Sequence, residues 1–133
     1  MRDNDFLTWY NSLNKPSWTP SPETIGTVWT VLYPIIIIVN FIVIKMLISK
    51  QISFIVALPF LINLVANLIF TPIQFGLRNF DLALLDILIV LITIIWSMFA
   101  IWPHKKALAL VFIPYLIWVL IASSLQAYIT FKN

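Results

Sequence analysis

Polar side chains recur at helical spacing inside long apolar stretches of the sequence. Two sets follow one helical face each: Asn63, Asn67, Thr71 and Gln74 at i, i+4, i+8 and i+11, and Asp86, Thr93 and Ser97 at i, i+7 and i+11. Because an amide or a carboxylate that faces lipid is costly, we expect both sets to turn toward the protein interior. There they can hydrogen-bond either a buried ligand or a neighbouring helix.

Two further stretches carry aromatic side chains, together with small and amide residues, at the same helical spacing. These sets are Gly26, Trp29, Tyr33 and Asn40 near the start, and Tyr115, Trp118, Ala122 and Gln126 near the end. Large aromatic rings beside a few fixed polar groups suit a flat, mostly apolar ligand. The alternative is that the rings fill the core and that the polar groups bond helix to helix, at about 0.6 kcal/mol each.

Asp86 is the one carboxylate placed well inside an apolar stretch. An ionisable side chain at membrane depth is a functional-site candidate by default. It can also cap the start of its helix or accept a hydrogen bond from a tryptophan indole.

Conventional catalysis has little support in this sequence. The single histidine, His104, lies beside Lys105 and Lys106, and the chain has no cysteine and only two glycines. No Ser/His/Asp set, thiol nucleophile, metal site or phosphate-binding loop is indicated. The formal net charge of +3 comes from scattered residues and forms no basic face for nucleic acid.

The elements that position these side chains are four long apolar runs. The chain is 62% hydrophobic and 10% charged, and the runs cover residues 24–48, 52–74, 82–102 and 107–131. About 20 apolar residues suffice for one transmembrane helix. The sequence therefore predicts an all-α integral membrane protein, a single domain over residues 1–133 that forms an up-and-down bundle of four transmembrane helices.

Two details of this bundle concern its prolines and its orientation. Pro34, Pro59, Pro72 and Pro114 lie within the runs, where we expect kinks and not breaks, because neighbouring groups can satisfy the freed carbonyls. Lys and Arg are evenly divided between the two sides of the membrane. The positive-inside rule therefore assigns no orientation.

The segment of residues 6–22 precedes the first run and is rich in aromatic residues and proline. Tryptophan and tyrosine favour the headgroup level of a bilayer, so the segment can serve as an interfacial anchor. Alternatively, it forms a lid that closes one end of an internal pocket.

Ordered motifs along the whole chain carry a family resemblance. They are Trp9-Tyr10-x-x-Leu13-x-Lys15-Pro16-x-Trp18-x-Pro20, Trp29-x-x-Leu32-Tyr33, Asn67-x-x-Phe70-x-Pro72-x-x-Phe75-Gly76, Ala83-Leu84-x-Asp86-x-Leu88-x-Val90 and Pro114-Tyr115-Leu116-x-Trp118. In sequence and spacing the chain resembles the TspO/MBR family of tryptophan-rich sensory proteins and translocator proteins.

The resemblance implies a membrane receptor whose helix bundle binds porphyrins such as protoporphyrin IX and haem, isoquinoline-type compounds and, in some members, cholesterol. No covalently bound cofactor is implied, and the expected location is the bacterial cell membrane. Trp9, Tyr10, Trp18 and Pro20 match the family's lid, and Trp29, Tyr33, Asn67, Trp118 and Ala122 match pocket positions. Phe70, Gln74 and Asp86 complete the predicted ligand site, and Trp29 and Trp118 match the tryptophans associated with porphyrin photochemistry.

The chain also departs from the family pattern. The family has five helices, and the one before the Trp-Tyr loop has no counterpart here. Phe70, Ser21 and Gln126 replace a Trp, a Pro and an Asn that are usual in the family. The family's small-residue dimer motif is weak, and Ser123 and Ala127 offer one small pair for a homodimer. Leu125, Tyr128 and Lys132 fit a proposed sterol pattern of low specificity.

Three classes of function follow. The first is a receptor in which Trp29 and Trp118 stack on a porphyrin, Asn67 and Gln74 bond its edge, and Lys15 meets a propionate at the rim. The second is a light-dependent enzyme that degrades porphyrin with the help of Trp29 and Trp118. The third is a structural or transport subunit without a ligand of its own.

Overall fold

The computed structural model describes residue 8 and residues 11–133, and it is built from helices alone within that part of the chain. The long elements are α2 (Pro22–Ile48), α3 (Phe54–Thr71), α4 (Phe80–Ile101) and α6 (Ile113–Lys132). The π-helical turn η1 (Pro72–Gly76) extends α3, and the short α5 (Lys106–Val111) precedes α6. Four segments are long and apolar enough to span a membrane, which confirms the predicted all-α transmembrane bundle.

Local sequence explains where two of the helices begin. The Ser21 side chain accepts a hydrogen bond of 3.1 Å from the backbone N–H of Thr24, and Pro22 occupies the first turn of α2. The Asn79 side chain caps α4 in the same way, through a 3.0 Å bond from the N–H of Leu82. Capping residues thus fix both helices at the end of the bundle that carries the candidate site.

The four prolines behave differently. Pro34 and Pro59 lie inside continuous helices, and Pro72 opens the π-helical turn. Residues 107–131 were expected to form one kinked helix, and they lie in one membrane span, Lys106–Lys132. This span is interrupted at a single residue, since α5 ends at Val111 and α6 begins at Ile113. Pro114 has no N–H to bond a carbonyl one turn earlier, and Phe112 instead bonds Ala109 three residues back at 3.1 Å.

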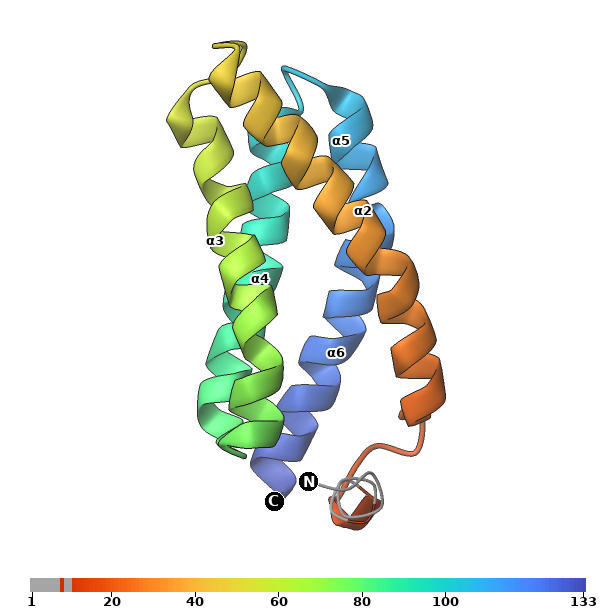
Figure 1. Cartoon of the computed structure of the whole chain (residues 1–133). Coiled ribbons are helices and arrows are strands. Elements are labelled where there is room, and N and C mark those ends of the chain that lie inside the picture. Colours follow the sequence, from red (N-terminus) through yellow and green to blue (C-terminus); the bar gives the residue numbers. More distant parts are fainter. Residues whose placement is uncertain (1–7, 9–10) are drawn as a thin grey trace.

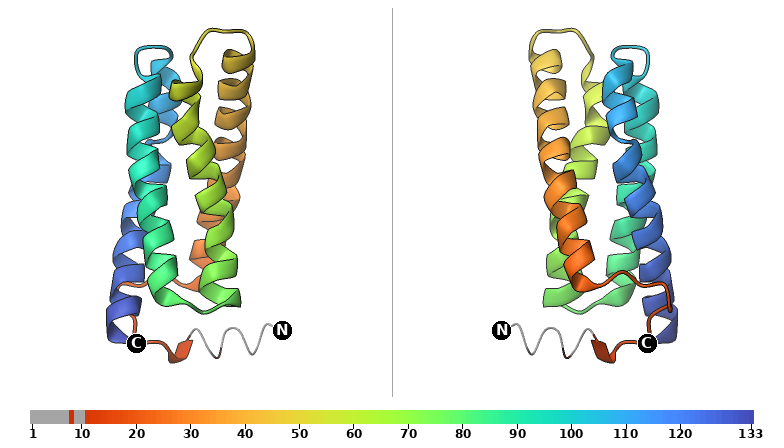
Figure 2. Two further views of the ribbon diagram at one scale, coloured as in Figure 1. Left: turned by 90° about the vertical axis from the view of Figure 1, so that its left-hand side faces the viewer. Right: turned by 90° about the vertical axis from the view of Figure 1, so that its right-hand side faces the viewer.

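The helices pack unequally. The α3–α4 and α4–α6 pairs have the most extensive main-chain contacts, whereas α2 contacts mainly α3. In Figure 1, α2 diverges from α3 toward its own N-terminal end. Figure 2 shows the segment of residues 11–21 and the C-terminus at this same end of the bundle. They are joined there by hydrogen bonds of 3.0 and 3.1 Å between Asn14 and Asn133.

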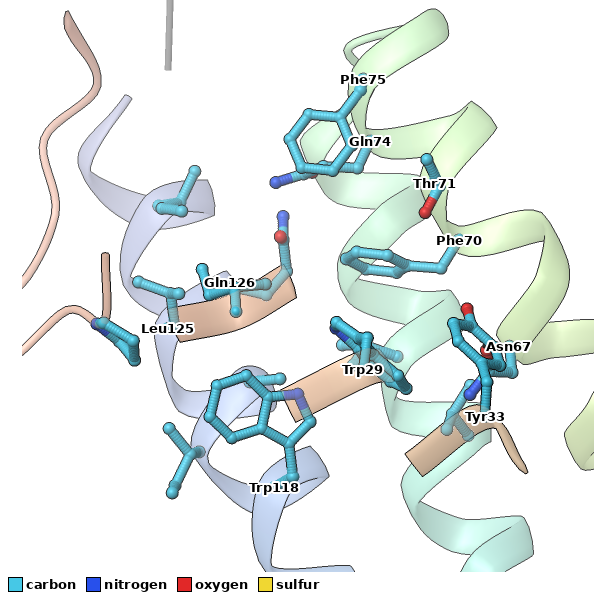
Figure 3. A pocket seen from close by; sticks show the side chains of 17 residues that line it. Trp29, Tyr33, Asn67, Phe70, Thr71, Gln74, Phe75, Trp118, Leu125 and Gln126 are labelled. Atoms are coloured by element: carbon cyan, nitrogen blue, oxygen red, sulfur yellow. Dashed lines mark hydrogen bonds between the residues drawn. The ribbon is translucent and has the colours of Figure 1, made fainter. Parts of the chain in front are cut away.

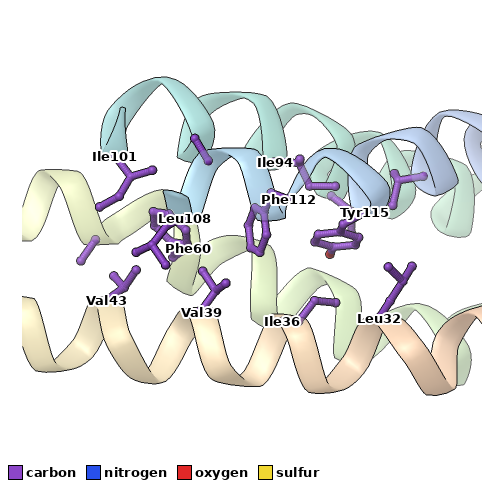
Figure 4. Packing of buried hydrophobic residues seen from close by; sticks show 14 of the residues in the cluster. Leu32, Ile36, Val39, Val43, Phe60, Ile94, Ile101, Leu108, Phe112 and Tyr115 are labelled. Carbon is purple, nitrogen blue, oxygen red and sulfur yellow. The ribbon is translucent and has the colours of Figure 1, made fainter. Parts of the chain in front are cut away.

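The packed core fills the other half of the bundle (Figure 4). Phe60, Phe112 and Tyr115 form its centre, with ring centroids 5.7 Å apart for the first pair and 5.3 Å for the second. Aliphatic side chains such as Ile36, Val39 and Ile94 surround them and are fully buried. Since lipid is as apolar as these side chains, close packing and not exclusion from water stabilises this core.

Candidate ligand pocket

A cavity of about 200 Å³ opens in the half of the bundle where α2 diverges. Its walls come from α2, from α3 with η1, and from α6, and α4 contributes its floor (Figure 3). The lining residues are Pro20, Ile25, Trp29, Tyr33, Asn67, Phe70, Thr71, Gln74, Phe75, Ile87, Val90, Trp118, Ile121, Ala122, Leu125, Gln126 and Ile129. None of these described lining residues carries a formal charge, so the cavity suits the uncharged, largely apolar part of a ligand.

Eight of the residues predicted for the site line this cavity together. They are Pro20, Trp29, Tyr33, Asn67, Phe70, Gln74, Trp118 and Ala122. Trp9 and Tyr10 lie outside the described residues. The structure therefore brings the predicted pocket positions of three helices around one space.

Two predicted residues lie elsewhere. Trp18 borders a separate outer groove with Pro20, Leu120, Ile121 and Ser124, and 53% of its surface is exposed. Asp86 is buried on α4 but is not among the cavity lining residues, and its Oδ2 atom has no hydrogen-bond partner within the described part of the chain. Asp86 belongs to the α4 face next to the pocket, one residue before the lining residue Ile87.

Several lining residues were not among the predicted site residues. Thr71 and Gln126 belong to the polar and aromatic sets of the sequence, and this spacing was the signal for them. The aliphatic ones, Ile25, Ile87, Val90, Ile121, Leu125 and Ile129, carry no such signal, because side chains of the same type also face lipid.

A chain of hydrogen bonds crosses the bundle at the inner end of the cavity. The Tyr33 hydroxyl donates to Asn67 Oδ1 at 3.0 Å, and Asn67 Nδ2 donates to the Tyr115 oxygen at 2.7 Å. The Tyr115 hydroxyl donates to Asn63 Oδ1 at 3.1 Å. Asn63 Nδ2 then donates to the Val90 carbonyl and to Thr93 Oγ1, both at 3.1 Å. Four helices are thereby joined through side chains that the sequence placed on interior faces.

Aromatic rings adjoin this chain on the pocket side. Trp29 and Tyr33 have ring centroids 5.2 Å apart at an interplanar angle of 31°, and Trp29 meets Tyr115 edge-on at 6.5 Å. Trp118 faces the same space from α6, as Figure 3 shows. Two indoles on different helices can therefore contact a flat ligand from two directions.

The π-helical turn positions the amides at the outer end of the cavity. The N–H of Leu77 bonds the carbonyl of Pro72 at 2.9 Å, five residues back, and this wider turn places Gln74 and Phe75 in the lining. In Figure 3, Gln74 and Gln126 point toward one another across the cavity. Gln74 is buried, yet its Oε1 has no hydrogen-bond partner among the described residues.

The segment of residues 11–21 lies at this outer end. Burial lowers the pKa of Lys15, whose ammonium group lies 3.5 Å from the carbonyl of Leu13. The side chain is thus partly removed from water at the end of the bundle where Pro20 enters the cavity lining. It is a cation of the kind that could meet a carboxylate at the rim.

Comparison with known proteins identifies the chain. The model of the TspO/MBR family matches residues 1–132. The chain belongs to the TspO/MBR family. Membrane protein YtaB of Bacillus subtilis is 37% identical over 94% of this chain and 80% of its own length. The tryptophan-rich protein TspO of Bacillus cereus is 36% identical over 90% and 76%, and the human translocator protein is 32% identical over 90% and 72%.

Membership of the TspO/MBR family confirms the resemblance carried by the sequence motifs. Together with the four spans and the bacterial relatives, it places the chain among multi-pass bacterial membrane proteins. Family members named as sensory and translocator proteins support a receptor or sensor role in the membrane. The proposed small-residue contact has little surface here, because Ser123 is buried and Ala127 is half-buried.

Proposed function

We propose that this TspO/MBR protein is a membrane receptor that binds a porphyrin, such as protoporphyrin IX or haem, in the cavity between α2, α3 and α6. The observation that carries the proposal is the lining itself. Trp29 and Trp118 offer two indole faces, Asn67 and Gln74 offer amides at the two ends, and no lining residue among those described is charged.

The orientation of the ligand follows from its charges. A carboxylate buried in the uncharged cavity would have no cation to compensate its lost hydration. The propionates therefore remain at the outer end, near the segment that contains Lys15, while the macrocycle lies between the indoles. Isoquinoline-like compounds, which are flat and smaller, fit the same wall residues.

The size of the cavity adds a condition. Its volume of about 200 Å³ lies below the roughly 300–1,000 Å³ of typical ligand pockets. A whole macrocycle therefore requires the walls to move apart. We assign this movement to α2, because α2 has the least extensive main-chain packing of the long helices.

Titration of the purified protein with protoporphyrin IX tests the proposal. Binding is followed by the Soret band and by quenching of tryptophan fluorescence. Trp118→Ala should weaken binding about tenfold or more, because aromatic stacking on a flat ring is worth roughly 1–3 kcal/mol. Trp96→Ala is the matched control, since Trp96 lies on α4, is 40% exposed and does not line the cavity. Equal affinities for wild type and both variants would overturn the proposal.

A second function, light-dependent porphyrin degradation, is favoured by the oxidisable ring of Trp29, which lines the cavity and contacts the rings of both Tyr33 and Tyr115. Illumination of the complex in air should then give an open-chain product, and replacing Trp29 and Trp118 by Phe should abolish it. Bleaching that these changes leave unaltered would mean that the protein only binds porphyrin. A stoichiometric partner that co-purifies with a porphyrin-free chain would favour a subunit role instead.

A further inference from the structure

Trp118 separates the candidate pocket from a second hollow on the outside of the bundle. This hollow, here called the α2–α6 groove, is lined by Thr27, Val28, Val31, Leu32, Pro114, Ile117 and Trp118. Trp118 is the one described residue that lines both the groove and the pocket. A displacement of this single side chain would therefore join them.

Side chains, not main-chain packing, close the seam between α2 and α6. The extensive main-chain contacts of α6 are with α4, and those of α2 are with α3. The edge-on contact between Trp29 and Tyr115 crosses the seam at the inner end of the pocket. Beyond that contact, Trp118 lies between the pocket and the groove.

No hydrogen bond within the described part of the chain holds the Trp118 ring in place. Its Nε1 atom is buried without a hydrogen-bond partner in the described part of the chain, so a rotation of the ring breaks no such bond. One turn away on α6 are Pro114 and Ala122, whose side chains are small. Open space adjoins the indole on the pocket side and on the groove side, because Trp118 lines both hollows.

The groove faces the hydrocarbon of the bilayer. Val31 and Ile117 are 59% and 54% exposed, and Val31 lies nine residues after the start of α2, about 14 Å along the helix axis. The hydroxyl of Thr27 donates to the carbonyl of Glu23 in its own helix at 3.0 Å. An apolar molecule dissolved in the membrane thus meets no unpaired side-chain hydroxyl in the groove.

We propose that Trp118 is a gate through which a flat, largely apolar ligand passes sideways from the bilayer into the pocket by way of the α2–α6 groove. The proposal rests on the binding function above, and it specifies how the ligand enters. It also accounts for a cavity smaller than a macrocycle, since separation of α2 from α6 opens the seam and widens the pocket in one movement.

Because the chain has no cysteine, the route can be tested by crosslinking in lipid vesicles. Val31→Cys with Ile117→Cys places one thiol on each side of the groove, and a short thiol-cleavable crosslinker then closes the seam. The rate constants of association and dissociation of protoporphyrin IX should both fall, association by about tenfold or more, because the crosslink blocks the route and also keeps α2 from separating to widen the pocket. Reduction of the crosslinker should restore both rates.

The matched control closes the alternative route of entry, which passes the segment of residues 11–21 at the outer end of the pocket. Asn14→Cys with Asn133→Cys joins two positions that are hydrogen-bonded in the structure. This crosslink should leave the rates unchanged. If it slows binding and the groove crosslink does not, the ligand enters past the segment of residues 11–21 and the gate is wrong.

A second measurement does not depend on porphyrin affinity. In an Ala122→Cys background, the pocket thiol is labelled by a lipid-soluble pyrene maleimide. Val31→Trp, which adds bulk to the groove, should slow this labelling, whereas Ile38→Trp, on a lipid-exposed part of α2 outside the groove, should not. Slowed labelling in a protein that binds no porphyrin would support the gate and contradict the proposed ligand. Equal labelling rates in the two variants would overturn the gate.

Discussion

The hydroxyl of Tyr33 on α2 donates a hydrogen bond to the side-chain carbonyl of Asn67 on α3. The direction of this bond is fixed from the far end of the chain. The Val90 carbonyl can only accept, so the amide nitrogen of Asn63 must face it, and Tyr115 must donate to the remaining oxygen of Asn63. Tyr115 then accepts from Asn67 Nδ2, which leaves Asn67 Oδ1 to accept the proton of the Tyr33 hydroxyl.

Removal of the central hydroxyl in Tyr115→Phe should destabilise the protein. The change leaves Asn63 Oδ1 and Asn67 Nδ2 buried without this partner, which costs about 1–2 kcal/mol. That is more than the average of about 0.6 kcal/mol for one hydrogen bond between membrane helices. Unfolding in a denaturing detergent titration measures the loss. Tyr128→Phe, at an exposed position, is the control and should have no effect; an equal loss in both would contradict the network.

Gln74→Leu should separate stability from binding. The wild-type side chain buries a carbonyl oxygen with no described partner, so its replacement should leave the free energy of unfolding unchanged or raise it by up to about 1 kcal/mol. Porphyrin affinity should fall, because the propionates at the outer end lose the Nε2–H donor of this amide. Gln126→Leu is the comparison: Gln126 Nε2 donates to the Phe80 carbonyl and Thr130 Oγ1, and the variant should lose stability. A stability loss in Gln74→Leu would show that its oxygen is satisfied.

Haem and protoporphyrin IX should bind with affinities within about tenfold of one another. The described lining residues include no histidine, cysteine or methionine, the usual axial ligands of haem iron besides tyrosine. Binding then depends on the ring faces that both molecules share. Parallel titrations, with the haem spectrum recorded in each, provide the measurement. A much tighter haem complex with a histidine-ligated spectrum would contradict this and direct attention to His104.

Lys15→Gln should weaken binding of protoporphyrin IX but not of its dimethyl ester, which has no carboxylate for the ammonium group to meet. The pH dependence follows from the lowered pKa of Lys15. The attraction is present below that pKa and is lost as the pH rises through it, earlier than for a solvent-exposed lysine. Titrations of both porphyrins from neutral to alkaline pH test this. If the variant and wild type lose affinity in parallel, Lys15 does not contact the propionates.

The spacing of polar and aromatic residues predicted much of this structure. Amides such as Asn67 and Gln74 are costly on a lipid-facing surface, so their periodicity identified an interior face. Trp29 and Trp118 follow the same helical spacing on two other helices, and the family motifs agree. The interruption at Phe112 was not predicted, because the same proline signal accompanies continuous helix at Pro34 and Pro59. That Trp18 and Asp86 do not line the cavity could not be read from the sequence, because neither exposure nor lining follows from residue type.

Because residues Pro72–Gly76 form a π-helical turn, the shape of the pocket depends on the number of residues in this segment. Such a turn holds one residue more than the α-helical turn it replaces. Deletion of one residue here would restore a regular helix and rotate whatever follows by about 100°. Gln74 and Phe75 would then leave the pocket without either being substituted. We therefore expect the ligand selectivity of this protein to depend on the extra residue that the π-helical turn holds, and a single-codon deletion should alter it.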